Sequence, residues 1–257
     1  MTAADVIRIK ELLPTSLGSD EIREHIAREI LQRSIFSARM ESARYLAKVR
    51  DVCAQIAAGK INLARAREVL LIVLAEMGHS PQDGGGLLNP ASRRRLTLIL
   101  DTQTQMAASV ARITSETADT IEDFPAYEFT RLEGRGTPRP DWERRWAAAG
   151  LTCNFEGALK DRLIALKTSP IWQHLGNGAG GYRDTLGNPY PPFAYGSGMG
   201  WLDVDWDECI ALGLIKEGER MENKPAIPRL SLDDAELLEA ARSVGWPGVF
   251  DDITLGG

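Results

Sequence analysis

The first 120 residues place apolar side chains at the spacing of amphipathic helices. Ser19, followed by two acidic residues, is typical of a helix start, and Ile22, Ile26 and Ile30 then recur four residues apart. The spacing predicts a helix that begins at Ser19 and carries the three isoleucines on one face.

Two further helices have clear start or stop signals. One is predicted from Met40 to about Ala58, with Gly59 as its C-terminal stop. The next is predicted to be capped by Asn62 and to end before Gly78. Residues 80–86, which are rich in glycine, then predict a flexible connection.

A fourth and longer helix follows this connection. Asn89 is the predicted cap and Pro90 the first helical residue, and the apolar period continues to about Thr117. The first 120 residues are therefore expected to form a helical region.

After Ile121 the apolar period breaks into short pieces, and all six tryptophans lie beyond this point. A short helix is predicted from Asp141 to Ala149, whereas residues 162–167 fit either a strand or a helix end. Further short helices are expected at three places, namely after Ser169-Pro170, after Asp203 or Asp205 up to Gly213, and from Ser231, in a capping box with Asp234, to about Val244. We predict a mainly α, α+β fold, with a helical part (1–120) followed by a loop-rich mixed domain (121–257) that has few strands.

The segment from Asn188 to Trp201 is the most distinctive stretch of the chain. Its three prolines fix φ and remove backbone donors, and its glycines admit positive φ, so it cannot be a regular helix or a central strand. A shaped aromatic loop of this kind is expected at a binding surface, an active site or an assembly contact. The candidate partner contacts are Trp142, Trp146, Tyr190, Pro191, Pro192, Phe193, Tyr195 and Met199. For any one of them, filling a small core is the alternative.

Composition narrows the class of protein. The 257 residues are 44% hydrophobic, enough for a real core, and no apolar run is long enough to cross a membrane. Three widely spaced cysteines do not form a disulfide framework. We expect a protein of the cytoplasm or of a particle assembled there.

Charge is distributed unevenly along the chain. Residues 1–67 hold 12 Lys and Arg against 8 Asp and Glu, whereas residues 199–257 hold 5 against 13. Arg93, Arg94 and Arg95 lie at the start of the fourth predicted helix, where cations oppose the helix dipole. They are candidate anion contacts, and a solvated helix face is the alternative.

Catalytic and metal-binding motifs are weak. The three histidines are isolated, and the acidic residues 203–208 lack the glycine and glutamate of a calcium loop, so we predict no metal and no cofactor. Cys153 and His174 could serve a hydrolase, and the glycine-rich loops between Gly176 and Gly200 could serve a transferase, but no family signature surrounds them. The glycines at 176–181 predict a mobile loop.

Four groups of segments, taken together, resemble the minor head or head morphogenesis proteins of tailed bacteriophages, the broad Mu F-like group. They are residues 33–46 continuing through 59–67; residues 95–107; residues 124–128 with 140–150; and residues 163–167 and 169–172 with Tyr190-Pro-Pro-Phe193, Ser197-Gly-Met199 and 203–205. Their order covers residues 30 to 215, and the Tyr-Pro-Pro-Phe to Ser-Gly-Met stretch carries most of the weight. The short Cys/His motif at the end of many members is missing, since the last hundred residues offer only His174 and Cys209.

The resemblance implies a low-copy structural protein, which associates with the portal or capsid interior while the head assembles in the host cytoplasm. The resemblance also implies an oligomer or a subunit bound in a larger assembly, located in some members inside the virion or close to the packaged DNA. The lack of a catalytic constellation in the sequence predicts that the protein is not an enzyme. The lack of a long apolar run predicts no membrane association. Two alternatives stay open: an enzyme that uses Cys153 and His174 or the glycine-rich loops, and a nucleic-acid-binding packaging accessory that uses Arg93 to Arg95.

Overall fold

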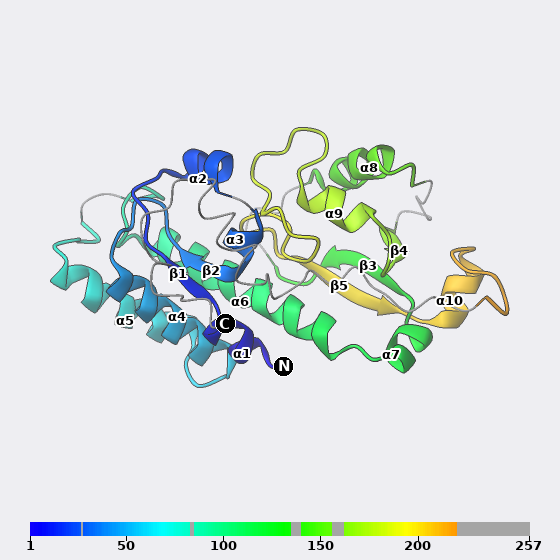
Figure 1. Ribbon diagram of the computed structural model, residues 1–257, viewed down its shortest axis with the longest axis horizontal. Helices are drawn as coiled ribbons and strands as arrows, with labels where there is room; N and C mark the ends of the chain where they lie inside the picture. The colour runs from blue at the N-terminus through cyan, green and yellow to red at the C-terminus, as the bar shows by residue number, and fades with distance from the viewer. Residues whose placement is uncertain (27, 83–84, 135–139, 156–161, 220–257) are drawn as a thin grey trace, which may run out of the picture.

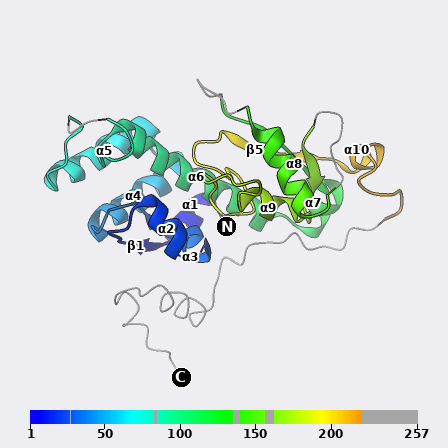
Figure 2. The ribbon, with the colours of Figure 1, turned by 90° about the horizontal axis from the view of Figure 1, so that it is seen from above.

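The computed structural model describes residues 1–219 except 27, 83–84, 135–139 and 156–161. It confirms the predicted fold class, because a helical N-terminal region precedes a mixed part that contains a small sheet. The two regions lie side by side in Figures 1 and 2, and one long helix, α6 (Arg93–Ser115), connects them. The predicted last helix, from Ser231 to Val244, lies outside the described residues.

The N-terminal region opens with short elements. They are α1 (Ala3–Arg8), β1 (Glu11–Leu13), α2 (Ser19–His25), α3 (Arg28–Arg33) and β2 (Ser34–Phe36), and β1 pairs with β2 in parallel. The single helix predicted from Ser19 through Ile30 is wrong, because Ile26 is extended (φ −108°, ψ 126°) and divides α2 from α3. Ile22, Ile26 and Ile30 nevertheless pack in one buried cluster with Leu13. The period therefore predicted the buried face correctly but not the break.

Two predicted helices form as expected. They are α4 (Ala43–Ala57) and α5 (Leu63–Glu76), capped by the side chains of Ser42 and Asn62. Gly59 and Gly78 follow them with φ of 69° and 85°, values that glycine adopts at little cost.

The start of α6 differs from the prediction by one turn. Ser92 caps α6, because its hydroxyl accepts from the Arg95 amide. Asn89 instead forms a local turn, in which its side chain accepts from the Ala91 amide and donates to the Ser80 carbonyl. An asparagine can serve either purpose, and here the turn competes successfully with the cap.

The mixed region is built around a three-stranded antiparallel sheet of order β4-β3-β5. Its elements are α7 (Ala118–Asp123), β3 (Ala126–Arg131), α8 (Trp142–Thr152), β4 (Ile164–Leu166), α9 (Ile171–Gly176), β5 (Met199–Val204) and α10 (Trp206–Ala211). Tyr127 is the central register point, since it pairs with Ala165 on one side and Asp203 on the other. Residues 162–167 thus contain a strand, which resolves the open alternative.

One large apolar core crosses the predicted boundary at residue 120. It contains buried side chains from α1, α4, α5 and α6 and continues into β3, α8, α9 and β5. The α6 helix packs on α1, α4 and α5, and Arg112 near its end donates to the Trp201 carbonyl of β5. The two regions therefore share a core through α6.

Candidate functional site

The aromatic side chains of the mixed region form a continuous cluster. Tyr127 stacks on Trp201 with ring centroids 4.2 Å apart and an interplanar angle of 8°. Phe193 lies edge-on to Phe129 at 5.3 Å and stacked near Trp172 at 6.1 Å. Such offset and edge-to-face pairs add to the stabilisation from burial alone.

The structure places most of the predicted partner contacts inside this core. The buried ones are Trp142, Trp146, Tyr190, Pro191, Pro192, Phe193 and Met199, and Tyr195 is half-buried. Phe193 is fully buried (0% exposed). The burial favours the core alternative, because these seven side chains are not exposed to a partner.

Polar groups hold the aromatic loop in shape. The Ser197 hydroxyl donates to the Pro192 carbonyl at 2.5 Å and accepts from the Met199 amide at 3.2 Å. The Asn188 amide donates to the Tyr190 carbonyl, and Phe193 has a positive φ of 54°. Backbone strain at Phe193 is offset by the complete burial of its ring.

The run of three arginines is divided by burial. Arg93 and Arg94 are exposed, but Arg95 is buried and does not present its charge to an external surface. Its guanidinium donates to the carbonyls of Leu87, Leu88 and Ala38 and to the Ser37 hydroxyl at 2.7 Å. Burial lowers the pKa of Arg95 below its usual value. A predicted anion contact at the outer surface is therefore restricted to Arg93 and Arg94.

Cys153 and His174 are not joined in a catalytic arrangement in the described part of the chain. The Cys153 thiol donates to the Ala149 carbonyl at 3.3 Å, as expected for a thiol at the end of α8. His174 lies in the last turn of α9, and no hydrogen bond links it to Cys153 among these residues.

The first glycine loop is closely packed rather than open. A Cβ on Gly176 would lie 1.9 Å from the Asn188 carbonyl oxygen, and one on Gly178 would lie 2.4 Å from the Tyr182 carbonyl oxygen. These glycines allow close backbone approach, and the prediction of a mobile loop missed that contact.

Three of the acidic residues between 203 and 208 have structural roles, either in ion pairs with arginines or as a helix cap. Asp203 pairs with Arg112 at 2.8 Å, Glu208 pairs with Arg162, and Asp205 caps α10. In the ranges that the structure describes, no three His, Cys, Asp or Glu side chains are grouped to hold a metal.

A buried ion network joins the end of α6 to the sheet. The Lys167 ammonium lies 2.7 Å from Glu116 and 3.1 Å from Asp203, with the Lys167 side chain fully buried. The Tyr127 hydroxyl donates to Glu116 at 2.5 Å, and burial followed by this hydrogen bond raises the tyrosine pKa. The network is a structural connection across the two regions.

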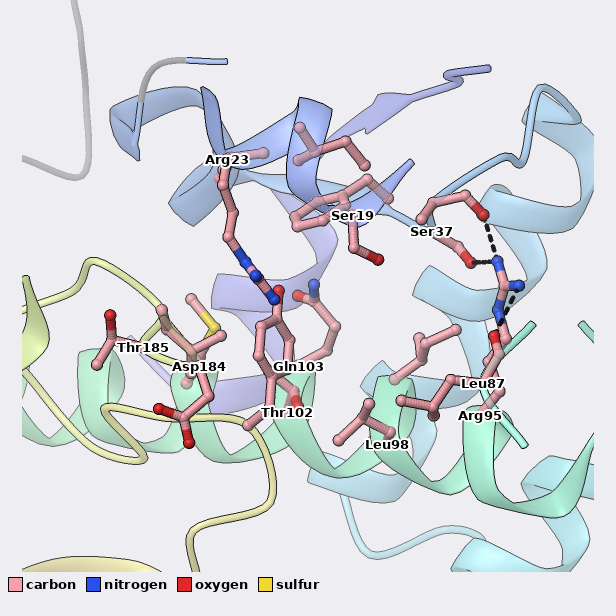
Figure 3. A pocket seen from close by; sticks show the side chains of 18 of the residues that line it. Ser19, Arg23, Ser37, Leu87, Arg95, Leu98, Thr102, Gln103, Asp184 and Thr185 are labelled. Atoms are coloured by element: carbon pink, nitrogen blue, oxygen red, sulfur yellow. Dashed lines mark hydrogen bonds between the residues drawn. The ribbon is translucent and has the colours of Figure 1, made fainter. Parts of the chain in front are cut away.

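A cavity of about 330 Å³ lies between the two regions. Most of its walls are apolar. In Figure 3, α6 runs along one side of the cavity and α2 lies across from it, with Asp184 and Thr185 at one end. Its lining includes Arg23, Arg95, Leu98, Thr102, Gln103 and Asp184. In Figure 3 the Arg23 side chain runs from α2 toward the middle of the cavity, while Arg95 lies to one side with Ser37 and Leu87.

Each polar group of the cavity has a different environment. Asp184 accepts two hydrogen bonds from Arg145, at 2.8 and 3.2 Å. Burial alone would lower the Arg145 pKa, but the hydrogen bonds to Asp184 and Asp141 raise it. Arg23 pairs with the exposed Asp20 at 3.2 Å.

A buried lysine lies directly behind the cavity. The Lys10 ammonium donates to the Gln103 side chain at 2.8 Å, and burial lowers the Lys10 pKa to about 8. The nearby Cys53 thiol is buried too, which raises its pKa to about 12.

Sequence reasoning did not find this cavity, because its walls come from distant segments. One signal was present: Arg95, Ile99, Thr102 and Met106 follow the helical period, so all four share one face of α6. An arginine and a threonine in phase with apolar residues indicate a mixed, partly buried surface.

Comparison of the chain with protein-family models, with curated proteins and with solved structures found no match. No helix in the described ranges is long and apolar enough to cross a membrane.

Proposed function

We propose that this chain is a structural component of a bacteriophage or prophage head, which associates with the portal or the capsid interior during assembly. The proposal rests on the resemblance of residues 30 to 215 to minor head proteins. The observation that carries it further is that the segments with this resemblance contact one another in the fold.

Arg95 supplies the first of these contacts. It opens the second resembling segment and donates to Ser37 and Ala38 of the first segment, more than fifty residues earlier. The arginine therefore connects α6 to the chain that follows β2.

The sheet supplies the second set. Tyr127 in the third segment pairs with Ala165 and Asp203, which belong to the last. Motifs that meet in one core are expected when a resemblance reflects a shared scaffold, and this supports the proposal.

The start of α6 offers an exposed surface for a partner. Leu88 is 83% exposed, and its carbonyl accepts from Arg95 in the first turn of α6. Arg93 and Arg94 are exposed in that same turn. We call Leu88, Arg93 and Arg94 the helix-start surface; an apolar anchor beside two arginines suits an acidic protein surface.

Co-purification tests the proposal. The chain is produced with the portal and capsid proteins of the same phage, and complexes are separated by size and cross-linked. We expect co-migration with the portal or with assembled heads, and cross-links near the helix-start surface. Arg94→Glu should weaken the association by about tenfold, because it reverses a charge at the contact.

Arg8→Glu is the matched control, since Arg8 is an exposed arginine on α1 that pairs with Asp5. It should leave the association unchanged. A folded chain that migrates apart from portal and capsid proteins, and is missing from purified heads, would contradict the proposal. So would enzymatic turnover that Cys153→Ser abolishes.

A role in DNA packaging is the second candidate, favoured by the exposure of Arg93 and Arg94. It predicts binding to random duplex DNA that weakens steeply as salt is raised. Binding that Arg94→Glu lowers and Arg8→Glu does not would favour this candidate over a purely protein-bound role.

A further inference from the structure

The cavity between the two regions has the size and the walls of a small-molecule site. Its volume of about 330 Å³ is at the lower end of the range for ligand pockets. At the volume that a water molecule occupies in the liquid, it would hold about ten non-hydrogen atoms. Leu31, Phe36, Leu98, Ile99 and Met106 supply an apolar lining.

One buried hydroxyl in this lining is left without a partner. Thr102 is 6% exposed, and its Oγ1 has no hydrogen-bond partner among the residues that the structure describes. Threonine in a helix commonly bonds the carbonyl one turn earlier, as Thr104 does with Leu100. Buried polar atoms are nearly always paired, and Thr102 is a lining residue of the cavity, so its unpaired hydroxyl is a candidate donor to a bound ligand.

The charges around the cavity favour an anion. The guanidinium groups of Arg23 and Arg95 both line it, and every hydrogen bond of Arg95 goes to a neutral acceptor. The one lining carboxylate, Asp184, is already held by Arg145 through two hydrogen bonds. Arg23 has an exposed carboxylate partner outside the lining, Asp20 at 3.2 Å, so among the described residues the lining itself holds two guanidinium groups and one carboxylate that is already paired.

We propose that this cavity binds a small amphiphilic anion, a molecule with an apolar body of about eight carbons and one carboxylate or similar group. The apolar body would lie against Leu98, Ile99 and Met106. The anionic group would lie toward Arg23 and accept a hydrogen bond from the Thr102 hydroxyl. The site is separate from the helix-start surface, so the inference does not depend on the role in head assembly.

Displacement of a fluorescent probe tests the proposal on the full chain. The probe is 1-anilinonaphthalene-8-sulfonate, an aromatic anion, and the competitors are octanoate, octylammonium and octanol. We expect octanoate to displace the probe at a concentration about tenfold lower than either of the others, because only octanoate has both features.

Two variants locate the site. Leu98→Trp fills the cavity from a half-buried position and should abolish octanoate binding. Thr102→Val removes the hydroxyl at nearly constant volume, so it should weaken octanoate binding about fivefold while raising the melting temperature of the ligand-free protein. A purely structural threonine would not give this opposite pair of effects.

The charge requirement has its own variant and control. Arg23→Gln should remove most of the preference for octanoate over octanol, whereas Arg94→Gln, outside the cavity, should retain it. Circular dichroism and melting curves establish that each variant is folded. Equal displacement by octanoate and octanol from the unaltered chain would overturn the proposal, as would unchanged octanoate binding by folded Leu98→Trp or Thr102→Val.

Discussion

Lys167 and Glu116, 51 residues apart in sequence, form an ion pair of 2.7 Å whose two side chains are 0% and 5% exposed. A pair buried to this degree stabilises the fold little by its presence, because both charges lose their hydration. Removing one partner is costly, since the other charge stays buried. The pair therefore makes the junction of α6 with the sheet sensitive to single substitutions.

Lys167→Met should lower the free energy of unfolding by about 3 to 5 kcal/mol, measured by urea denaturation. The variant leaves the Glu116 carboxylate buried, with only the Tyr127 hydroxyl donating to it among the described residues. The double variant Lys167→Met/Glu116→Leu should recover about 2 kcal/mol of this loss. A loss below about 1 kcal/mol in the single variant would contradict the interpretation of the network.

Substitution of Arg95 should lower the free energy of unfolding far more than substitution of either neighbouring arginine. Arg95→Met removes hydrogen bonds to four acceptors in two chain segments, so we expect a loss of about 2 to 4 kcal/mol in the free energy of unfolding. Arg93→Met and Arg94→Met should change it by less than about 0.5 kcal/mol, because both side chains are exposed. Thermal melts of the three variants make the comparison, and equal effects would refute it.

The sequence predicted local features well. Start and stop signals at Asn62 and Gly78 placed α5 correctly, because a cap depends on a few neighbouring residues. The spacing of Ile22, Ile26 and Ile30 predicted a common buried face correctly. It did not predict the break at Ile26, since two helices separated by an extended residue can bury the same face.

The candidate site was much less predictable. Prolines and aromatics in residues 188–201 indicate a shaped loop, but they are equally suited to a surface and to a core, and Phe193 lies in the core. The cavity depends on how α2, β2, α6 and residues 184–195 come together, and no local pattern contains that information. Short strands such as β1 and β4 are also too brief to show a period.

Lys10 should make stability depend on pH in a defined direction. Its pKa is about 8 in the folded protein against an ordinary value of 10.5, so the unfolded chain holds the proton more tightly. Stability contributed by this residue therefore rises as pH increases from about 8 to 10.5. Relative to Lys10→Met, the unaltered protein should gain about 1 to 2 kcal/mol in free energy of unfolding between about pH 7.5 and pH 9.5.

Urea denaturation at several pH values measures this gain. Taking the difference between the two proteins removes the titration of the buried cysteines, which both contain, and the pH-independent loss of the Gln103 partner. Lys48→Met, at an exposed lysine of α4, should keep the pH dependence of the unaltered protein. If the difference in free energy of unfolding between the two proteins does not change from pH 7.5 to 9.5, the pKa of Lys10 is not lowered in the folded protein.

Gly176 should tolerate no larger side chain. A Cβ at this position would lie 1.9 Å from the Asn188 carbonyl oxygen, so Gly176→Ala must displace the backbone that leads into the aromatic loop. We expect a loss of about 2 to 4 kcal/mol in the free energy of unfolding and altered near-ultraviolet circular dichroism from the displaced aromatics.

Gly134→Ala is the control, because a Cβ there meets no atom of the described residues within 4 Å. It should alter the free energy of unfolding by less than about 0.5 kcal/mol. Similar losses in the two variants would mean that the contact with Asn188 is not the cause.

The 23 residues of α6 give it a length of about 35 Å. Its first turn carries the exposed Arg93 and Arg94, and Arg112 near its far end is bonded to the β5 backbone. Because α6 packs on α1, α4 and α5 and is also bonded to β5, a displacement of its arginine end would be transmitted to both regions.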